Sequence, residues 1–437
     1  MADPMVSERG RGVERGDKEH GTSKDILKQF RKDVEVMGIS VKAQNVGKAL
    51  RLFDGYLLAG RQIRSVVNDG DDKGRKLLLL STKYSGNDDK DIHNELQNKL
   101  KELNEPYTLK PYTYEMTAKQ LSIHEILEEL LPNGLKPITS YEKIGHIAHV
   151  NLREEHLPYK HLIGEVFLQK SGGQLRTIVN KTSSIANQFR TFPLEVIAGE
   201  ENYVTRVREA GCIFELDFSK VYWNSRLQSE HCRLVELFGA DEVVWDMMAG
   251  IGPFAVPAAR KGCRVYANDL NPISFKYLCK NMDINKTKMQ CYNQDAREFV
   301  QSLAVAERET RGKESRNVEP PSRIVMNLPA SSVDFLDALP GLFEEPLPMV
   351  HCYYFSKDED PKAALQKIVT TKLGCSVDHP SCELEIREVR DVSPRKRMYC
   401  ISFRLPREAA FGVWASLGGK RGRSGGESSP TIPSSKR

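Results

Sequence analysis

The sequence predicts an α/β protein whose largest part is an open, mostly parallel sheet. Two observations predict this sheet: short apolar stretches alternate with helical stretches over residues 243–326, and a turn with two glycines follows the first apolar stretch. A third observation is that polar residues follow the expected strands, where a parallel sheet would gather them at one edge.

The first expected strand ends in Asp246, and the turn after it contains Gly250 and Gly252. Glycine lets the backbone turn sharply and approach a ligand closely. Pro253 suits the first position of the helix that follows, and Gly262 suits the end of that helix. A strand, a glycine turn and a helix in this order begin a nucleoside-binding unit.

The second expected strand, residues 264–268, is followed directly by Asp269. An acid at this place, about 20 residues beyond the first strand, accepts hydrogen bonds from ribose hydroxyls. The turn lacks a lysine for phosphate, and Asp246 would repel a pyrophosphate but suits the cationic groups of S-adenosylmethionine. A nicotinamide or flavin dinucleotide is the alternative, because Ala255 is a permitted substitute for the third glycine of its pattern.

Two further expected strands end in polar residues. Residues 289–294 form the third strand and lead into Asp295 and Ala296, where adenine's exocyclic amine would need an acceptor. Residues 323–326 form the fourth strand, which stops at Asn327. Each polar residue alone could be an ordinary helix cap or turn. Because four strand ends carry one, we expect a common ligand-binding edge.

A loop rich in Asn, Ser and aromatic residues precedes the first strand and enters a helix that ends near Gly239. Ser229 or Asn224 could cap this helix. The helix would bring Glu230 and His231 close to the ligand-binding edge. The alternatives are that Glu230 is a first-turn acid favoured by the helix dipole and that His231 is a surface residue.

Together these segments resemble the eukaryotic and archaeal tRNA (guanine-37-N1) methyltransferases. The resemblance covers about residues 140–405, and the segments that carry it are 222–227 with Glu230, then 246–254, 269–272 and 327–329. It implies a Rossmann-like class I S-adenosylmethionine methyltransferase domain, preceded by two smaller α/β (α+β) domains that bind tRNA. The substrate would be tRNA with guanine at position 37, on the 3′ side of the anticodon, including the first step of wybutosine synthesis on phenylalanine tRNA.

The resemblance also implies roles for individual residues. The cofactor would be held by His231, Asp246, Gly250, Gly252, Asp269, Leu270, Asp295, Ala296 and Asn327. The guanine would be bound by Tyr222, Arg190, Asn327 and Pro329. Arg190 is identified by the resemblance alone. Tyr222 would pack near a base that has left its stack, and the rigid Pro329 would hold Asn327 against the guanine edge.

The chemistry needs a base, because N1 of guanine carries a proton at neutral pH and is a poor nucleophile. Glu230 is the candidate, and burial would make it a stronger base. Negative charge spreads to O6 as N1 loses its proton, so Arg190 would stabilise the transition state. A charged hydrogen bond of this kind contributes roughly 1.5–3 kcal/mol.

Two other functions fit the same scaffold. One is the aminocarboxypropyl transferase of wybutosine synthesis, which moves a different group from the same sulfonium. Residues 327–329 together with Glu230 favour methyl transfer instead. The other is a catalytically silent tRNA-binding protein, against which the presence of Asp269, Glu230 and Arg190 argues.

Composition is compatible with a multi-domain enzyme of 437 residues. No run of about 18 apolar residues predicts a membrane span. The net charge of +5 permits RNA binding through local patches without establishing it. Nine scattered cysteines without a C-x-x-C pair indicate reduced thiols and no structural zinc or other metal site. We expect a monomer in cytoplasm and nucleus, and the poor presequence leaves the mitochondrial matrix open.

The expected domain boundaries follow shifts in composition and pattern. They are a disordered N-terminus at 1–22, an N-terminal α/β domain at 23–135, a second small RNA-binding domain at 136–215, the methyltransferase domain at 216–407 and a disordered basic tail at 408–437.

Within these domains the pattern predicts further elements. Strands are expected at 50–53, 75–80, 144–152, 175–179 and 192–197, and helices at 91–103 and 159–168. A charged insertion at 307–323 is expected to be a flexible loop, and 383–392 with 397–404 an antiparallel strand pair that closes the sheet.

Overall fold

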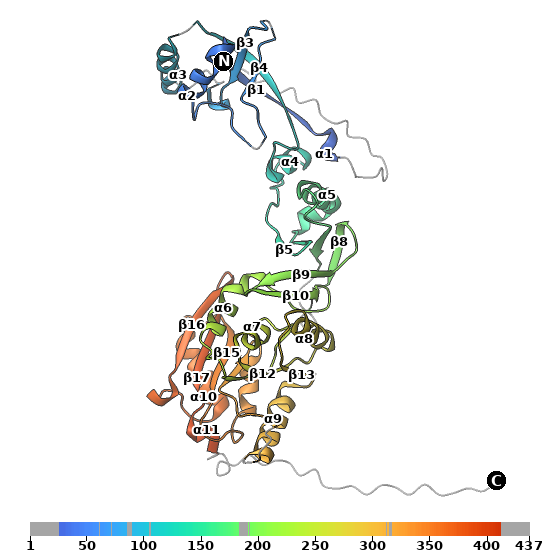
Figure 1. The fold of residues 1–437 in the computed structure, drawn as a ribbon, viewed down its shortest axis with the longest axis vertical. Coiled ribbons are helices and arrows are strands. Elements are labelled where there is room, and N and C mark those ends of the chain that lie inside the picture. The colour runs from blue at the N-terminus through green and yellow to red at the C-terminus, as the bar shows by residue number, and fades with distance from the viewer. Residues whose placement is uncertain are drawn as a thin grey trace, which may run out of the picture. The chain divides into compact units, whose positions relative to one another are not determined.

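A computed structural model describes residues 26–411 of the chain except 61, 71, 85–89, 105, 183–190, 192, 312 and 314–316. The chain forms two compact units (Figure 1). The first comprises residues 1–185 with 192–205, and the second 186–191 with 206–437. This division does not test the domain boundaries expected from the sequence, so they stay predictions. The expected disordered ends at 1–22 and from 412 onward lie outside the described residues.

The first unit contains two four-stranded sheets. The antiparallel sheet, in the order β2-β3-β1-β4, comprises β1 (Arg31–Lys42), β2 (Val66–Asn68), β3 (Arg75–Leu79) and β4 (Thr108–Thr117). The second sheet, in the order β5-β6-β7-β8, comprises β5 (Glu142–Ile144), β6 (Ile147–Val150), β7 (Thr177–Lys181) and β8 (Leu194–Gly199). The helices are α1 (Ile26–Gln29), α2 (Val46–Leu52), α3 (Lys90–Leu103), α4 (Ile123–Leu130) and α5 (Lys160–Lys170).

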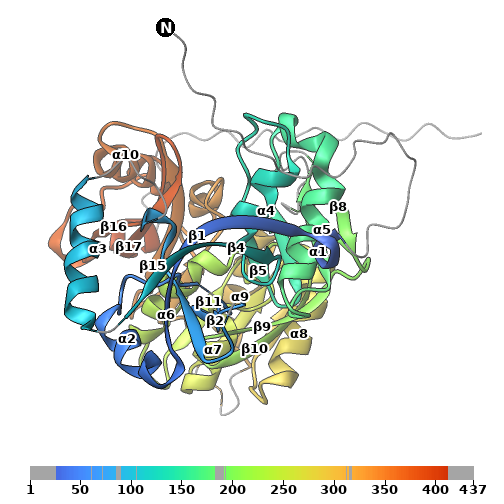
Figure 2. The same ribbon diagram turned by 90° about the horizontal axis from the view of Figure 1, so that it is seen from above.

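Strand β1 serves two cores because its side chains alternate between the faces of the sheet. Ile39 and Val41 pack with α2 and α3 on one face. Val36 packs on the other face in a core that also includes α4, α5 and the second sheet. Figures 1 and 2 show β1 as a long curved strand that runs from the α2 and α3 end of its sheet to α1.

The second unit is built on a seven-stranded sheet in the order β13-β12-β11-β14-β15-β17-β16. Its strands are β11 (Val243–Asp246), β12 (Arg264–Asn268), β13 (Gln290–Tyr292), β14 (Arg323–Met326), β15 (Met349–Ser356), β16 (Glu385–Ser393) and β17 (Lys396–Arg404). The first five are parallel, and β17 is antiparallel to both β15 and β16. The predicted parallel sheet and its closing antiparallel pair are therefore confirmed.

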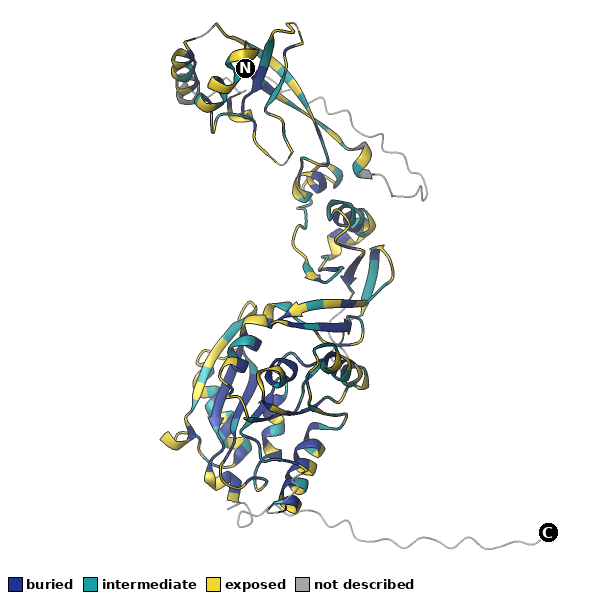
Figure 3. Ribbon diagram, viewed as in Figure 1, coloured by how far each residue is buried: buried dark blue, intermediate teal, exposed yellow. Residues whose placement is uncertain are grey.

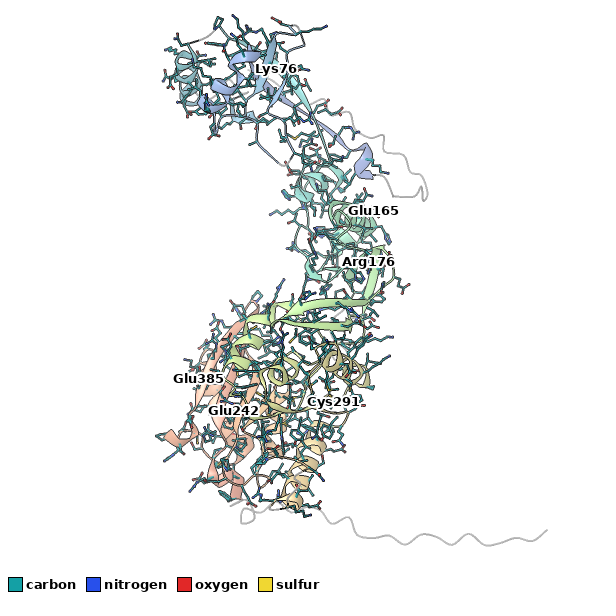
Figure 4. All side chains as sticks on the ribbon, viewed as in Figure 1. Lys76, Glu165, Arg176, Glu242, Cys291 and Glu385 are labelled. Carbon is teal, nitrogen blue, oxygen red and sulfur yellow. The ribbon has the colours of Figure 1, made fainter. Side chains whose placement is uncertain are left out.

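Helices cover both faces of this sheet. They are α6 (Gln228–Glu236), α7 (Ala255–Lys261), α8 (Pro272–Ile284), α9 (Ala296–Thr310), α10 (Pro361–Leu373) and α11 (Arg407–Phe411), and β9 (Val204–Glu209) pairs with β10 (Cys212–Asp217) in a separate ribbon. Residues of α6 and α7 form one core and those of α9 and α10 the other. The central strands are buried along their length, whereas β16 is largely exposed (Figure 3). The two edge strands of the sheet are β13 and β16, and Figure 4 labels one residue on each of them, Cys291 on β13 and Glu385 on β16.

Several local expectations are wrong, each for a physical reason. Residues 50–53 end a helix, α2, instead of forming a strand, because Ala49 and Phe53 are one helical turn apart and both enter the core. Helix α7 begins at Ala255, two residues after Pro253. The expected loop at 307–323 begins as helix, since α9 continues to Thr310 and buries Glu307. Residues 408–411 belong to α11.

Strand β15 was not expected from the sequence at all. It reads Met-Val-His-Cys-Tyr-Tyr-Phe-Ser, and both of its faces are covered, so it lacks the alternation that marks a half-exposed strand. In the part of the chain that the structure describes, no helix is long and apolar enough to cross a bilayer. Over the same residues no group of three His, Cys, Asp or Glu side chains could hold a metal ion.

Candidate active site at the ends of the parallel strands

The order of the strands places a ligand site at the carboxyl end of β11. The chain passes from β11 to β12 and β13 on one side, and then crosses back to β14 on the other side of β11, so the strand order reverses at β11. Open α/β sheets bind ligands at such a switch point. Asp246 pairs with Ala267 and with Val325, so Asp269 and Asn327 each follow two residues beyond a partner of Asp246. The predicted common edge is confirmed for these three strands.

The two glycines of the turn have different constraints. Both have left-handed backbones, with φ of 57° at Gly250 and 100° at Gly252. A Cβ on Gly252 would lie 2.8 Å from Cγ2 of Val256 and 3.0 Å from Cδ1 of Leu278. A Cβ on Gly250 would meet no atom within 4 Å, so it would enter open space. Packing requires glycine at 252, whereas only backbone conformation requires it at 250.

Asp269 is held by backbone amides. Its Oδ2 accepts from the amide of Gly250 at 2.8 Å and its Oδ1 from the amide of Asn271 at 2.9 Å. The hydroxyl of Ser274 also donates to this carboxylate. Two oxygens with two acceptor positions each therefore keep one position for a ribose hydroxyl. Burial raises the pKa of Asp269 to about 6, against the effect of these amides. The neighbouring Leu270 is 41% exposed.

Asn268 is a structural residue of this site that the sequence analysis missed. Its Nδ2 donates to the carbonyls of Met247 at 3.1 Å and Gln294 at 3.0 Å, and its Oδ1 accepts from the amide of Gln294 at 2.9 Å. The side chain is buried. It therefore ties the loops after β11 and β13 to the end of β12. The signal for it was a polar residue inside an otherwise apolar strand.

Asp246 is completely buried, and neither of its carboxylate oxygens has a hydrogen-bond partner among the described residues. Burial raises its pKa to about 8, and the negative charge of Asp269 adds to this, while the nearby amide of Met248 opposes it. A buried polar group without a partner is costly in free energy unless a ligand supplies one. Asp246 therefore fits a ligand that is cationic or donates hydrogen bonds.

Asp295 acts as a helix cap, one of the two roles considered from the sequence. Its Oδ1 accepts from the amide of Arg297 at 2.8 Å, at the N-terminus of α9. Ala296 is the first residue of that helix and is buried. The expected contact of both residues with the cofactor stays a prediction.

Glu230 lies in the first turn of α6 and is 5% exposed. Its Oε1 accepts from Nη2 of Arg233 at 2.6 Å and from the hydroxyl of Tyr353 at 2.8 Å. Its Oε2 accepts from Nε of Arg233 at 2.7 Å. A carboxylate oxygen has two acceptor positions, so Oε1 is saturated and Oε2 keeps one position. The predicted base is thus buried as expected, within a network that the sequence did not reveal.

Tyr353 is the second residue that the sequence analysis missed. It is fully buried on β15, and its ring packs against Phe254 with centroids 5.8 Å apart. Burial raises its pKa well above the ordinary value, so the hydroxyl remains a hydrogen-bond donor to Glu230. No signal in the sequence pointed to Tyr353, because β15 itself was not predicted.

His231 is buried, so its interpretation as a surface residue is wrong. Its Nδ1 is hydrogen-bonded to the carboxylate of Glu209 on β9. Its ring meets Phe254 edge-on at 4.7 Å, and Nε2 has no hydrogen-bond partner among the described residues. The pair fixes α6 against β9, and a contact with the cofactor stays a prediction.

The base-binding candidates lie on two loops. Neither Ser229 nor Asn224 caps α6 itself, because its N-cap residue is Leu227, which makes no side-chain cap hydrogen bond. Asn224 instead caps the short 3-10 turn before α6, where its Oδ1 accepts from the amide of Arg226 at 3.1 Å. Its Nδ2 donates to the hydroxyl of Tyr222 at 3.3 Å, and Tyr222 is 40% exposed. Such a half-exposed ring is able to stack on a base.

The second loop follows β14. Oδ1 of Asn327 is buried without a hydrogen-bond partner among the described residues. The carbonyl of Pro329 accepts from the amide of Phe355 at 2.9 Å, which fixes this loop against β15. Asn327 therefore offers a buried acceptor on a fixed loop. Arg190 lies outside the described residues.

Comparison with known families gives two matches. The TRM5/TYW2 methyltransferase domain matches residues 205–378, and the TYW2 N-terminal domain matches residues 123–202. Two solved structures share the fold. Trm5b from Pyrococcus abyssi is 22% identical with a TM-score of 0.57, and the match covers 84% of this chain and 98% of that one. The structure of aTrm5 in complex with tRNALeu is 24% identical with a TM-score of 0.58, and the match covers 85% of this chain and 100% of that one.

Curated relatives extend the similarity over nearly the whole chain. A tRNA (guanine(37)-N(1))-methyltransferase of Phytophthora infestans is 39% identical and covers 89% of this chain and 94% of its own. Those of Mus musculus and Homo sapiens are 40% and 39% identical, over 86% and 87% of this chain and 76% of each relative. This chain therefore belongs to the tRNA (guanine(37)-N(1))-methyltransferase family.

Proposed function

We propose that this chain transfers the methyl group of S-adenosylmethionine to N1 of guanine 37 in tRNA, with Glu230 as the general base. Membership of the family supports the reaction. The structural observation that carries the assignment is the unpartnered carboxylate of Asp246, buried at the switch point of the sheet next to Asp269.

The residues present fit this cofactor. Asp246 offers a buried carboxylate to its cationic groups, Asp269 offers a remaining acceptor position to its ribose, and Gly250 leaves open space beside the turn. S-adenosylmethionine supplies an electrophilic methyl group when bound. The proposed contacts of His231, Leu270, Asp295 and Ala296 would surround the same ligand.

The protein's own groups then prepare guanine for attack. Oε2 of Glu230 would take the N1 proton, and N1 would then be the nucleophile for the methyl group that bound S-adenosylmethionine would supply. Arg233 and Tyr353 hold the carboxylate during this step. Arg190 donates to O6, where negative charge develops.

The remaining contacts hold the base. Oδ1 of Asn327 accepts from the guanine edge, which satisfies a buried atom that otherwise lacks a partner. Pro329 keeps that loop in place, and Tyr222 stacks on the base after it leaves the anticodon loop. Both contacts replace interactions that the base loses when it unstacks.

The second candidate is aminocarboxypropyl transfer, the alternative already considered from the sequence. It would break a different carbon–sulfur bond of the same sulfonium. The guanine(37)-N1 relatives, matched over 86–89% of this chain, favour methyl transfer. We further propose that the protein acts as a monomer in cytoplasm and nucleus, that the mitochondrial matrix is an additional location, and that its product on phenylalanine tRNA enters wybutosine synthesis.

The test is incubation of the purified protein with labelled S-adenosylmethionine and unmodified tRNA, beside a tRNA with adenine at position 37 and the Glu230→Gln variant. The nucleoside digest is analysed by mass. We expect N1-methylguanosine only with guanine 37 and intact Glu230. An aminocarboxypropyl adduct would establish the second candidate, and tight tRNA binding without any product would identify a silent binder.

A further inference from the structure

The outermost strand of the sheet, β16, contains an irregularity beside the site. Arg387 pairs with Cys400 of β17 and Glu388 with Tyr399, but the next paired residue is Arg390, with Met398. Val389 is therefore the extra residue of a β-bulge. Bulges next to active sites change the direction of side chains.

The bulge changes which face Arg390 occupies. Arg387 and Arg390 are three residues apart, so in a regular strand their side chains would point to opposite faces. Their partners Cys400 and Met398 are two residues apart and share one face, where both belong to the core that includes α6. The bulge therefore brings both arginines to the face of the sheet that carries Glu230.

Contacts agree with this placement. Nε of Arg387 lies 3.9 Å from Oε2 of Glu230, the oxygen with a remaining acceptor position. Nη1 of Arg390 donates to Oδ1 of Asn224 at 3.5 Å, next to the exposed ring of Tyr222. Both arginines thus lie beside the residues that would receive the base.

The charge on the two faces differs. On the opposite face of this hairpin, Arg397 is 3.2 Å from both Glu388 and Asp391, so its charge is compensated at the surface. The Arg387 side chain is 51% exposed, and its nearest carboxylate belongs to the proposed base. The structure gives no ion pair for Arg390 among the described residues. Two weakly compensated cations therefore border the site.

We propose that Arg387 and Arg390 bind the RNA phosphates that flank the target nucleotide. This proposal rests on the proposed function and names the surface that receives the substrate backbone. A nucleotide that leaves its stack carries its flanking phosphates to the mouth of the site, and guanidinium groups bind phosphate oxygens through paired hydrogen bonds. The bulge at Val389 places both cations where those phosphates arrive.

The experiment measures tRNA affinity of the full chain across a salt series, for wild type, Arg387→Gln, Arg390→Gln and the double variant. Each phosphate contact contributes about 0.7–0.9 to the slope of log affinity against log salt. We expect each single variant to lower that slope by about this amount and the double variant by about twice as much. Arg397→Gln is the matched control, with the same charge change on the opposite face, and should leave the slope unchanged.

Two outcomes would overturn the proposal: slopes equal to wild type in the Arg387 and Arg390 variants, or an equal decrease in Arg397→Gln. Lower melting temperatures with unchanged slopes would assign the two arginines to stabilising the fold. Because affinity is measured without turnover, failure of this proposal is distinguishable from failure of the proposed function. That function fails separately if wild type binds tRNA but forms no N1-methylguanosine.

Discussion

The two sides of the proposed site are held in different ways. On the cofactor side, Asp269 is fixed by two backbone amides, that of Gly250 in the turn after β11 and that of Asn271 in its own turn after β12. On the base side, Glu230 is fixed by the side chains of Arg233 and Tyr353. Tyr353 is 123 residues away in sequence. The cofactor side therefore depends on local backbone geometry, and the base side depends on how the complete sheet is assembled.

This difference predicts that changes on the base side should affect the chemical step and leave cofactor binding intact. The largest effect should come from Glu230→Gln, which keeps shape and removes the base. We expect kcat to fall by about 10²–10⁴-fold, as removal of a general base does. Affinity for S-adenosylmethionine, measured by calorimetry, should remain that of wild type.

Glu236→Gln is the matched control for this variant, since Glu236 lies on the same helix and is exposed. It should retain wild-type kcat. A Glu230→Gln enzyme that loses cofactor affinity along with kcat would contradict the separation of the two sides.

The next largest effect should come from the cofactor side. Asp246→Asn removes a charge that would face a cationic ligand, and we expect affinity for S-adenosylmethionine to fall about tenfold to hundredfold. Equilibrium binding without tRNA measures this change. Unchanged affinity would remove Asp246 from the cofactor site. Asp241→Asn, an exposed acid just before β11, is the control and should bind normally.

Asp246→Asn should lower affinity for the cofactor but raise the stability of the ligand-free protein. The pKa of Asp246 is about 8 in the folded protein and near the ordinary 3.8 when unfolded. The stability that this group contributes is fully present below pH 3.8 and is lost as pH rises through 8. Asp246→Asn should therefore raise the melting temperature of the ligand-free protein at pH 8 and flatten its decline from pH 5 to 8. A scanning calorimetry series that shows equal decline in both proteins would contradict this.

A smaller effect should come from Tyr353→Phe, which removes the hydroxyl that donates to Glu230 and leaves the ring against Phe254. Loss of one hydrogen bond to a carboxylate is worth about 1.5 kcal/mol, so we expect kcat to fall about tenfold. KM for S-adenosylmethionine should not change. Tyr354→Phe, on the neighbouring residue of β15, is the control. An unchanged kcat in Tyr353→Phe would show that Arg233 alone positions the base.

The contrast between the two sides also explains what the sequence could predict. The strand, glycine turn and acid around Asp246 and Asp269 were predicted because they lie in one short segment with strong local preferences. Tyr353 could not be predicted, since β15 is buried on both faces and lacks strand alternation. Its distance from Glu230 along the chain left no local pattern. The role of Asn268 was equally hidden, because its three hydrogen bonds reach loops on two other strands.

The bulge in β16 is another feature that the sequence could not predict. A sequence pattern assigns Arg387 and Arg390 to opposite faces, since strand alternation has a period of two. Only the pairing with β17 shows that Val389 is an extra residue. Residues at functional sites are where local rules fail most often, and this edge strand is an example.

The smallest effect tests the backbone argument within the glycine turn itself. Gly250→Ala and Gly252→Ala both force a residue with a Cβ into a left-handed conformation, which costs on the order of 1 kcal/mol. Only Gly252→Ala also brings Cβ to 2.8 Å from Val256. Denaturant unfolding should therefore show a larger loss of stability for Gly252→Ala. For Gly250→Ala the stability loss should be small, while cofactor affinity falls because its Cβ enters the open space beside the turn. Equal stability losses in the two variants would mean that strain alone, and not packing against α7 and α8, fixes the turn.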